Sequence, residues 1–372
     1  MKKGKKIMLI IASIFLAVVL IFVFGDGTFL PKKYASVWSE SYIEQMENDQ
    51  SRMIAYGIRG SSSHNTQPWL VKVKASETIE LYADMDKALD VVDGDYKQLL
   101  MSQGTFIERY SEAASQYGYR VEITYNEPGL SDKTPLIATI KIHKDADPAA
   151  VDIVSSSTYA SGNPDKKVDF EKTLDQCIAE YPGFSYTIIE TADDVEKLKG
   201  LLLEGTIIES KDESATKELL DVFRWTEWEK NEYRYGLSLN TLPAVLKPFI
   251  QPLMKSSSDN WEAFGDSSIK QFKERLALQT KYILIKFENP GNNEYIKSGK
   301  LFQKLIFEES QYELRPAMQL LENFDAMQSL NMQFQQDYGE DAGVVMIIGV
   351  QEKTGAAAAG NPRHLVEDIL IN

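Results

Sequence analysis

One stretch of the sequence gathers side chains that could do chemistry. It runs from Ser61 to Trp69 and reads Ser-Ser-Ser-His-Asn-Thr-Gln-Pro-Trp. Its hydroxyls, imidazole and carboxamides offer hydrogen-bond donors and acceptors to a planar polar ligand. The same residue types are also typical of a turn that leads into a strand, so the residues alone leave both interpretations open. The candidate ligand contacts are Ser62, Ser63, His64, Asn65 and Gln67.

Some of these residues have structural interpretations beside the functional one. His64 suits a structural hydrogen bond as well as a ligand contact, and Gln67 could fix the loop itself. Trp69 follows Pro68 at the start of an apolar run, so we expect it in the core rather than stacked on a ligand.

We name no catalytic side chain, and the rest of the sequence shows no metal-binding pattern. His143 and His364 have no metal-ligand spacing with His64, and Cys177 is the only cysteine, which excludes an internal disulfide and a cysteine-rich metal site. A nucleophile elbow, a phosphate loop and the Rossmann glycine fingerprint are all missing from the sequence.

Length and charge narrow the function classes. The chain has 372 residues and 43% hydrophobic content, enough for a buried core and for two domains. Residues 1–33 hold six lysines and one aspartate, which leaves 34 basic and 54 acidic residues in the remainder and a net charge of −20. This strongly acidic part of the chain repels the phosphate backbone of nucleic acids, so we exclude nucleic acid as a partner.

The N-terminus predicts a membrane anchor. Residues 7–24 form an uncharged apolar run of 18 residues, long enough to cross a bilayer, and no small-residue cleavage site follows it. Four lysines precede the run, whereas only Lys32 and Lys33 follow it closely. The positive-inside rule therefore places the N-terminus in the cytoplasm and the globular part outside the cell membrane, on a single-pass anchor.

The elements that position the serine-rich loop follow from hydrophobic periodicity. Helical spacing precedes the loop in residues 34–58, and a helix from Tyr96 to Tyr117 ends at Gly118. From Glu213 the helical pattern continues through Phe223 and Trp225. Further helices are expected at 170–179, at 192–208 and from 294, and strands at 70–73, 78–82, 120–125, 136–143, 186–190, 282–287 and 343–350, the last at a sheet centre.

A short internal repeat suggests two related halves. When Gly104 is set on Gly299, residues 115–117 (Ser-Gln-Tyr) fall on residues 310–312, at a constant offset of 195 residues. We therefore expect an intramolecular pseudo-dimer. The expected domains are 1–33 (basic stub and anchor), 34–205 (first half) and 206–372 (second half). Residues 239–258 carry three prolines and are either a lid over a pocket or an irregular connection.

The loop resembles the flavin-facing segment of the nitroreductase superfamily, in which Pro-Ser-Ser-x-Asn-x-Gln-Pro-Trp lies against FMN; here Ser61 replaces the proline. The closest likeness is to the single-chain Acg-like branch with two fused, degenerate halves. Residues 84–93, Ser102-Gln103-Gly104, Gly349 and Pro362-Arg363 fit further segments of that branch, with Lys87 in place of its usual arginine. The resemblance implies an α+β (α/β) fold with a mixed sheet flanked by helices, here preceded by the N-terminal transmembrane helix.

The resemblance also implies a function. It implies an FMN-dependent oxidoreductase that reduces a small acceptor, a nitro compound or a quinone, with electrons from NAD(P)H or from a membrane donor. Arg363 would hold the phosphate, Arg59 would take the place of the family's N-terminal phosphate motif, and Arg224 is either a ligand contact or a surface ion pair. Two alternatives remain: a protein that sequesters or senses FMN without turnover, and a non-flavin binding module on the same fold.

Overall fold

The computed structural model describes residues 2–127, 129–145, 169–238, 246–256, 260–309, 311–339, 342–353 and 361–372. Its α-helices are α1 (Lys2–Gly25), α2 (Glu40–Glu44), α3 (Asp49–Ile58), α4 (Lys97–Gln116), α5 (Phe170–Ala179), α6 (Ala192–Lys211), α7 (Glu213–Asp221), α8 (Glu227–Tyr233), α9 (Lys247–Ser256), α10 (Trp261–Leu276), α11 (Asn292–Glu308), α12 (Gln328–Tyr338) and α13 (Val366–Ile369). Short 3-10 helices are η1 (Lys33–Trp38), η2 (Ser63–Asn65), η3 (Met85–Lys87) and η4 (Gln319–Leu321). The strands are β1 (Trp69–Ala75), β2 (Thr78–Ala83), β3 (Tyr119–Tyr125), β4 (Leu136–Lys144), β5 (Phe184–Ile189), β6 (Phe223–Arg224), β7 (Leu237–Ser238), β8 (Gln279–Phe287), β9 (Tyr312–Pro316), β10 (Gly343–Glu352) and β11 (Leu370–Ile371).

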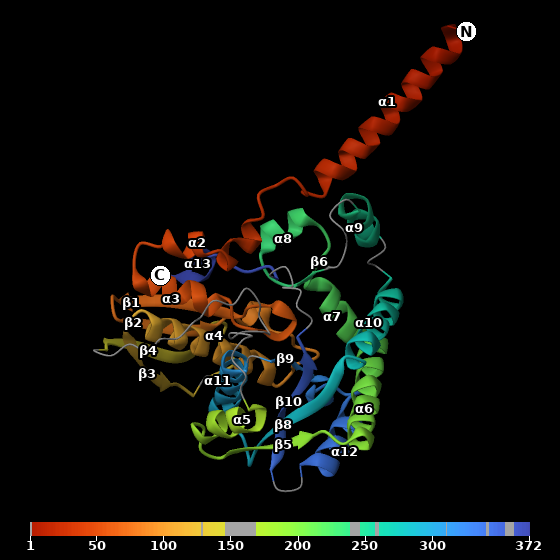
Figure 1. Cartoon of the computed structure of the whole chain (residues 1–372). Helices are drawn as coiled ribbons and strands as arrows, with labels where there is room; N and C mark the ends of the chain where they lie inside the picture. The colour runs from red at the N-terminus through yellow and green to blue at the C-terminus, as the bar shows by residue number, and fades with distance from the viewer. Residues whose placement is uncertain are drawn as a thin grey trace.

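The fold is α+β, with helices flanking a mixed sheet and an antiparallel sheet (Figure 1). The first sheet has the order β11-β1-β2-β4-β3, in which only the C-terminal β11 pairs in parallel, and α3 and α4 pack on it. The second has the order β5-β8-β10-β9 and is antiparallel throughout. Buried side chains on its two faces pack against α11 on one side and against α6 and α12 on the other.

The two sheets share one topology. In each, the second strand leads into a long helix, α4 or α11, and the two strands that follow the helix add to the sheet in inverted order. β1-β2-β4-β3 therefore corresponds to β5-β8-β10-β9. Two related halves would produce this arrangement.

The helices α4 and α11 cross at the two glycines of the repeat. A Cβ atom on Gly104 would lie 1.9 Å from the carbonyl oxygen of Ile296, and one on Gly299 would lie 1.9 Å from that of Met101. The contact is reciprocal at the offset of 195 residues, because Ile296 corresponds to Met101. Such an exchange is what a pseudo-twofold axis between two halves requires. Ser310, part of the repeat motif, lies outside the described residues.

Most predicted elements are present with bounds shifted by a few residues, and β10 lies inside its sheet as predicted. Gly118 ends α4 with a φ of 77°, the left-handed conformation expected of a glycine stop. The helix predicted from Glu213 through Trp225 was wrong in its C-terminal part. α7 ends at Asp221, because Phe223–Arg224 pairs as a strand with Leu237–Ser238.

The boundary expected between residues 205 and 206 falls inside α6. β5, which the sequence assigned to the first half, is hydrogen-bonded to β8 and therefore belongs to the second sheet. Of the segment 239–258, only residues 246–256 are described; they contain α9, which packs beside α1.

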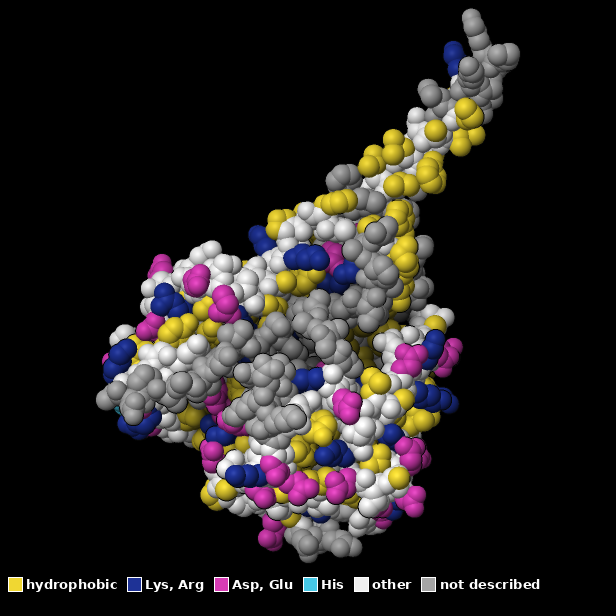
Figure 2. All heavy atoms as spheres, in the orientation of Figure 1, with side chains coloured by type: hydrophobic (Ala, Val, Ile, Leu, Met, Phe, Trp, Pro, Cys, Tyr) yellow, Lys and Arg dark blue, Asp and Glu magenta, His cyan; other side chains and the backbone are white. Residues whose placement is uncertain are grey.

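α1 projects from the body as a single helix (Figure 1). Figure 2 shows apolar side chains along it. Met8, Ile11 and Phe15 are 70%, 62% and 69% exposed. Within the described part of the chain, no helix meets the length and apolarity that crossing a membrane demands.

Candidate functional site

The serine-rich loop joins α3 to β1 and has an unusual backbone. His64, Asn65 and Gln67 have φ values of 44°, 58° and 53°, the left-handed region that costs non-glycine residues energy. Contacts with α4 hold it there: the Ser63 backbone N–H donates to Ser102 Oγ at 3.2 Å, and Ser63 Oγ donates to Gln98 Oε1 at 3.1 Å. The strained turn is therefore fixed by neighbouring side chains.

Gln67 fixes the loop rather than facing a ligand. It is fully buried, and its Nε2 donates to the carbonyl oxygens of Pro362 and Arg234, both at 3.1 Å. Its Oε1 accepts a hydrogen bond from the backbone N–H of His364 at 3.0 Å. Gln67 thus binds the C-terminal segment to the loop, the structural role that the sequence left open for it.

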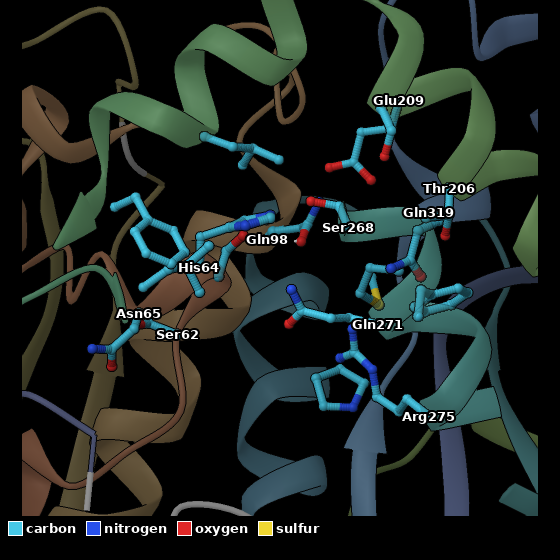
Figure 3. Close-up of a pocket in the computed structure, with 18 of the residues that line it drawn as sticks. Ser62, His64, Asn65, Gln98, Thr206, Glu209, Ser268, Gln271, Arg275 and Gln319 are labelled. Carbon is cyan, nitrogen blue, oxygen red and sulfur yellow. Dashed lines mark hydrogen bonds between the residues drawn. The ribbon is translucent and has the colours of Figure 1, made fainter. Parts of the chain in front are cut away.

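Asn65 has a similar structural role, although it lies at the cavity wall described below. Its Nδ2 donates to the carbonyl oxygens of Gly236 at 3.0 Å and Pro362 at 2.9 Å, and its Oδ1 accepts from Arg363. Figure 3 shows its carboxamide turned away from the centre of the cavity.

Arg363 lies behind the loop. The guanidinium is 1% exposed, lies 5.1 Å from the centre of the Trp38 ring and donates to the carbonyl oxygens of Gly60 at 3.1 Å and Pro362 at 3.0 Å. It does not line the cavity. It thus supplies donors to two backbone carbonyl oxygens, one directly before the loop and one in the C-terminal segment.

The other two predicted arginines also lie outside the cavity lining. Arg59 is 1% exposed, donates to the Val37 carbonyl oxygen at 2.8 Å and pairs with Glu40 at 3.3 Å. Arg224 is buried, so it is not the surface ion pair considered from the sequence; its guanidinium lies 4.4 and 4.5 Å from the ring centres of Tyr233 and Tyr235. Trp69 is in the core, as predicted, against Phe106.

The loop opens onto a cavity of about 570 Å³ between the two halves. Ser62, Ser63, His64 and Asn65 are the predicted site residues that line it. The second half contributes polar groups from α6, α10 and the segment around η4 (Figure 3). Lining residues that sequence reasoning missed include Gln98, Thr206, Glu209, Gln271, Arg275 and Glu322.

Two of the missed groups carry a sequence signal. On α10, Phe264, Ser268, Gln271 and Arg275 recur at spacings of three and four residues, so they share one face of the helix. On α6, Glu209 continues the buried face of the helix, where a glutamate is uncommon. No local pattern marks Glu322, since it follows a single 3-10 turn.

The cavity brings three ligand-type side chains together. Atoms of His64, Glu209 and Glu322 lie within 4.8 Å of one another. Burial, and next the charge of Arg275, lowers the pKa of His64 to about 4, so the imidazole is neutral at neutral pH. Burial raises the pKa of Glu209 and also that of Glu322, which faces the charge of Glu209 as well. No metal-binding spacing marks these three residues in the sequence, because they are distant from one another in the chain.

A second polar cluster lies behind the loop. Lys87 Nζ is 2.6 Å from His364 Nε2, and Asp368 lies 3.7 Å from His364 Nδ1. Burial is the main cause that lowers the pKa of His364 to about 4. Lys87, which replaces the usual arginine of the resembled branch, therefore contacts the C-terminal segment.

No protein-family model matches this chain, and no curated protein does. The likeness to nitroreductases therefore depends on the motif residues alone.

Proposed function

We propose that the cavity binds FMN and that the protein is a nitroreductase-like oxidoreductase acting on a small acceptor such as a nitro compound or a quinone. The observation that supports it is the position of the serine-rich loop, which forms one wall of a 570 Å³ cavity shared by both halves. Ligand pockets commonly span about 300–1,000 Å³. Bound flavin would supply hydride and electron transfer, while the chain binds it and controls access.

The cavity suits the flavin ring. Met101, Phe302 and Met346 supply apolar surface on the side of the helix crossing, and Phe223 and Trp225 supply aromatic surface from the second half. A ring system with one polar edge needs both such surface and hydrogen-bonding groups. Ser62, Ser63 and Gln98 offer those groups at the loop.

The phosphate would lie toward α10. Arg275 is the one Lys or Arg among the described residues that line the cavity, and it is exposed at the rim with Ser267 and Gln271. A guanidinium flanked by hydroxyl and amide groups suits a phosphate dianion. In this proposal Arg275 takes the role that the family likeness gave to Arg363.

Visible absorption tests the proposal. The full-length protein, purified in detergent or reconstituted with FMN, should retain about one flavin per chain after gel filtration, as expected of a resident cofactor. Anaerobic NADPH or a reduced quinone should then bleach the flavin band. A protein that stays colourless after reconstitution would favour a non-flavin binding module instead.

A second candidate is a protein that stores or senses FMN. Met254 of α9 lines the cavity, so the described part of the predicted lid, residues 246–256, reaches it. A covered flavin would be shielded from electron donors. Retained flavin that neither NAD(P)H nor reduced quinones can bleach would support this candidate over the oxidoreductase.

Membrane attachment through residues 7–24 is also a proposal. The exposed apolar side chains along α1 support it, as does its projection from the body (Figure 2). The full-length chain should sediment with membranes and resist extraction by high salt, because apolar contacts are not screened by ions. A chain released by salt alone would contradict attachment through α1.

A further inference from the structure

The three ligand-type side chains in the cavity come from separate parts of the fold. His64 lies in η2, Glu209 near the end of α6, and Glu322 directly after η4. Figure 3 shows His64 and Glu209 reaching into the cavity from opposite sides. Their donor atoms nevertheless lie within 4.8 Å of one another. Both halves are thus needed to form the cluster.

Burial sets the two glutamates apart from ordinary surface carboxylates. Glu209 is 6% exposed and Glu322 is 4% exposed, and both line the cavity. Glu322 Oε2 has no hydrogen-bond partner among the described residues. Glu322 faces the acidic groups Glu209, Asp93 and Glu218, whereas the charge of Arg275 bears on Glu209 and His64. A buried carboxylate in such surroundings needs a cation or a proton to compensate it.

We propose that His64, Glu209 and Glu322 bind one divalent transition-metal ion through an imidazole nitrogen and one oxygen from each carboxylate. Two carboxylates and a dication are neutral together, which removes the cost of burying the pair. One nitrogen and two oxygen donors suit the series from Mn²⁺ to Zn²⁺ rather than Ca²⁺ or Mg²⁺, which prefer oxygen ligands alone.

The geometry is close to that of a bound ion. Ligand atoms about 2.1 Å from a tetrahedral ion are about 3.4 Å apart. The donor atoms lie within 4.8 Å of one another, so small rotations of the glutamate side chains would close the site. Three protein ligands leave a coordination position open toward the cavity, as in catalytic rather than structural metal sites.

The proposal does not depend on the flavin, because metal binding can be measured without it. The full-length protein is stripped with a chelator, dialysed and titrated with Mn²⁺, and free Mn²⁺ is followed by electron paramagnetic resonance. Zn²⁺ is then added in competition. We expect one Mn²⁺ per chain, displaced by Zn²⁺ because zinc is the tighter-binding ion of the series.

Three Glu→Gln variants, each of which removes one carboxylate, test where the ion binds. Loss of an outer-shell partner weakens metal binding about 10- to 100-fold. Glu209→Gln and Glu322→Gln each remove a proposed direct ligand, so each should weaken Mn²⁺ binding by more than that. Glu204→Gln is the control, since Glu204 lies exposed on the same helix as Glu209 and outside the cavity lining. It should bind as the parent protein does.

Thermal unfolding separates loss of the site from loss of the fold. Zn²⁺ should raise the unfolding temperature of the parent protein and of Glu204→Gln, because an ion that binds the native state stabilises it. It should not raise that of Glu322→Gln, which lacks one of the ligands. The metal-free Glu322→Gln protein should be at least as stable as the metal-free parent, since the neutral amide avoids the cost of burying a carboxyl group among acidic neighbours. Absence of stoichiometric binding to the parent, or binding unchanged in both cavity variants, would overturn the proposal.

Discussion

The crossing of α4 and α11 makes a sharp prediction about Gly104. A Cβ atom there would lie 1.9 Å from the Ile296 carbonyl oxygen, whereas ordinary contact begins at 3.4 Å, so the helices must separate by about 1.5 Å. The obstacle is backbone, which cannot rotate away. Overpacking of this kind costs about 1–3 kcal/mol, against a gain of about 1 kcal/mol from the better helix propensity of alanine. We therefore expect Gly104→Ala to lose up to about 2 kcal/mol of unfolding free energy.

Gly200 provides the matched control. It lies within α6, and a Cβ atom on it would meet nothing within 4 Å. Gly200→Ala should therefore stabilise the protein by about 0.5–1 kcal/mol. Urea unfolding followed by tryptophan fluorescence measures both. The double variant of Gly104 and Gly299 should cost less than the sum of the single variants, because one separation of the helices accommodates both methyl groups. If Gly104→Ala were as stabilising as Gly200→Ala, the close crossing would be refuted.

Three further predictions concern the supports of the loop. Gln67→Ala should lower the unfolding free energy by about 2–4 kcal/mol in urea titrations, because it leaves several buried backbone groups unpaired, at about 1–3 kcal/mol each; a loss below 1 kcal/mol would contradict the structural role of Gln67. Arg363→Lys should cost about 2 kcal/mol or more in stability, since lysine cannot reproduce the planar donor set, while FMN affinity changes less; the reverse pattern would restore Arg363 as a phosphate ligand. The lowered pKa of His364, about 4 against 6.5 when unfolded, means that the unfolded state binds the proton more readily between these values. Stability should therefore fall as pH falls from 6.5 to 4, by up to about 3 kcal/mol, and His364→Gln should remove that part of the loss in urea titrations at each pH; an unchanged pH dependence would contradict it.

Local sequence patterns predicted much of the fold. The apolar spacing in residues 96–117 and the glycine that follows define α4, because helix period and a left-handed stop are properties of the local chain. The alternating and continuous apolar runs in the sequence likewise predicted most of the strands. The helix predicted beyond Asp221 failed because strand pairing with residues 237–238, a tertiary contact, overrode the local periodicity.

The site was predicted only in part. The loop from Ser61 to Trp69 was found because its chemistry is contiguous, and Ser62, Ser63 and His64 do line the cavity. Arg363 was assigned to a ligand, although in the structure its guanidinium donates to the carbonyl oxygen of Gly60, directly before the loop. The opposite wall was missed because the meeting of α6, α10 and the segment after η4 depends on packing between the halves, which no local motif encodes.

The most direct test of flavin binding in this cavity is a titration of the flavin-free protein with FMN, followed by flavin fluorescence. Arg275→Gln is compared with Lys273→Gln, an equal charge change on an exposed residue of α10 outside the cavity lining. Loss of a charge-assisted hydrogen bond of about 1.5–3 kcal/mol should weaken binding about 10- to 150-fold in Arg275→Gln and leave Lys273→Gln at parent affinity. A parent protein that does not bind FMN, or equal affinities in the two variants, would contradict the proposed site.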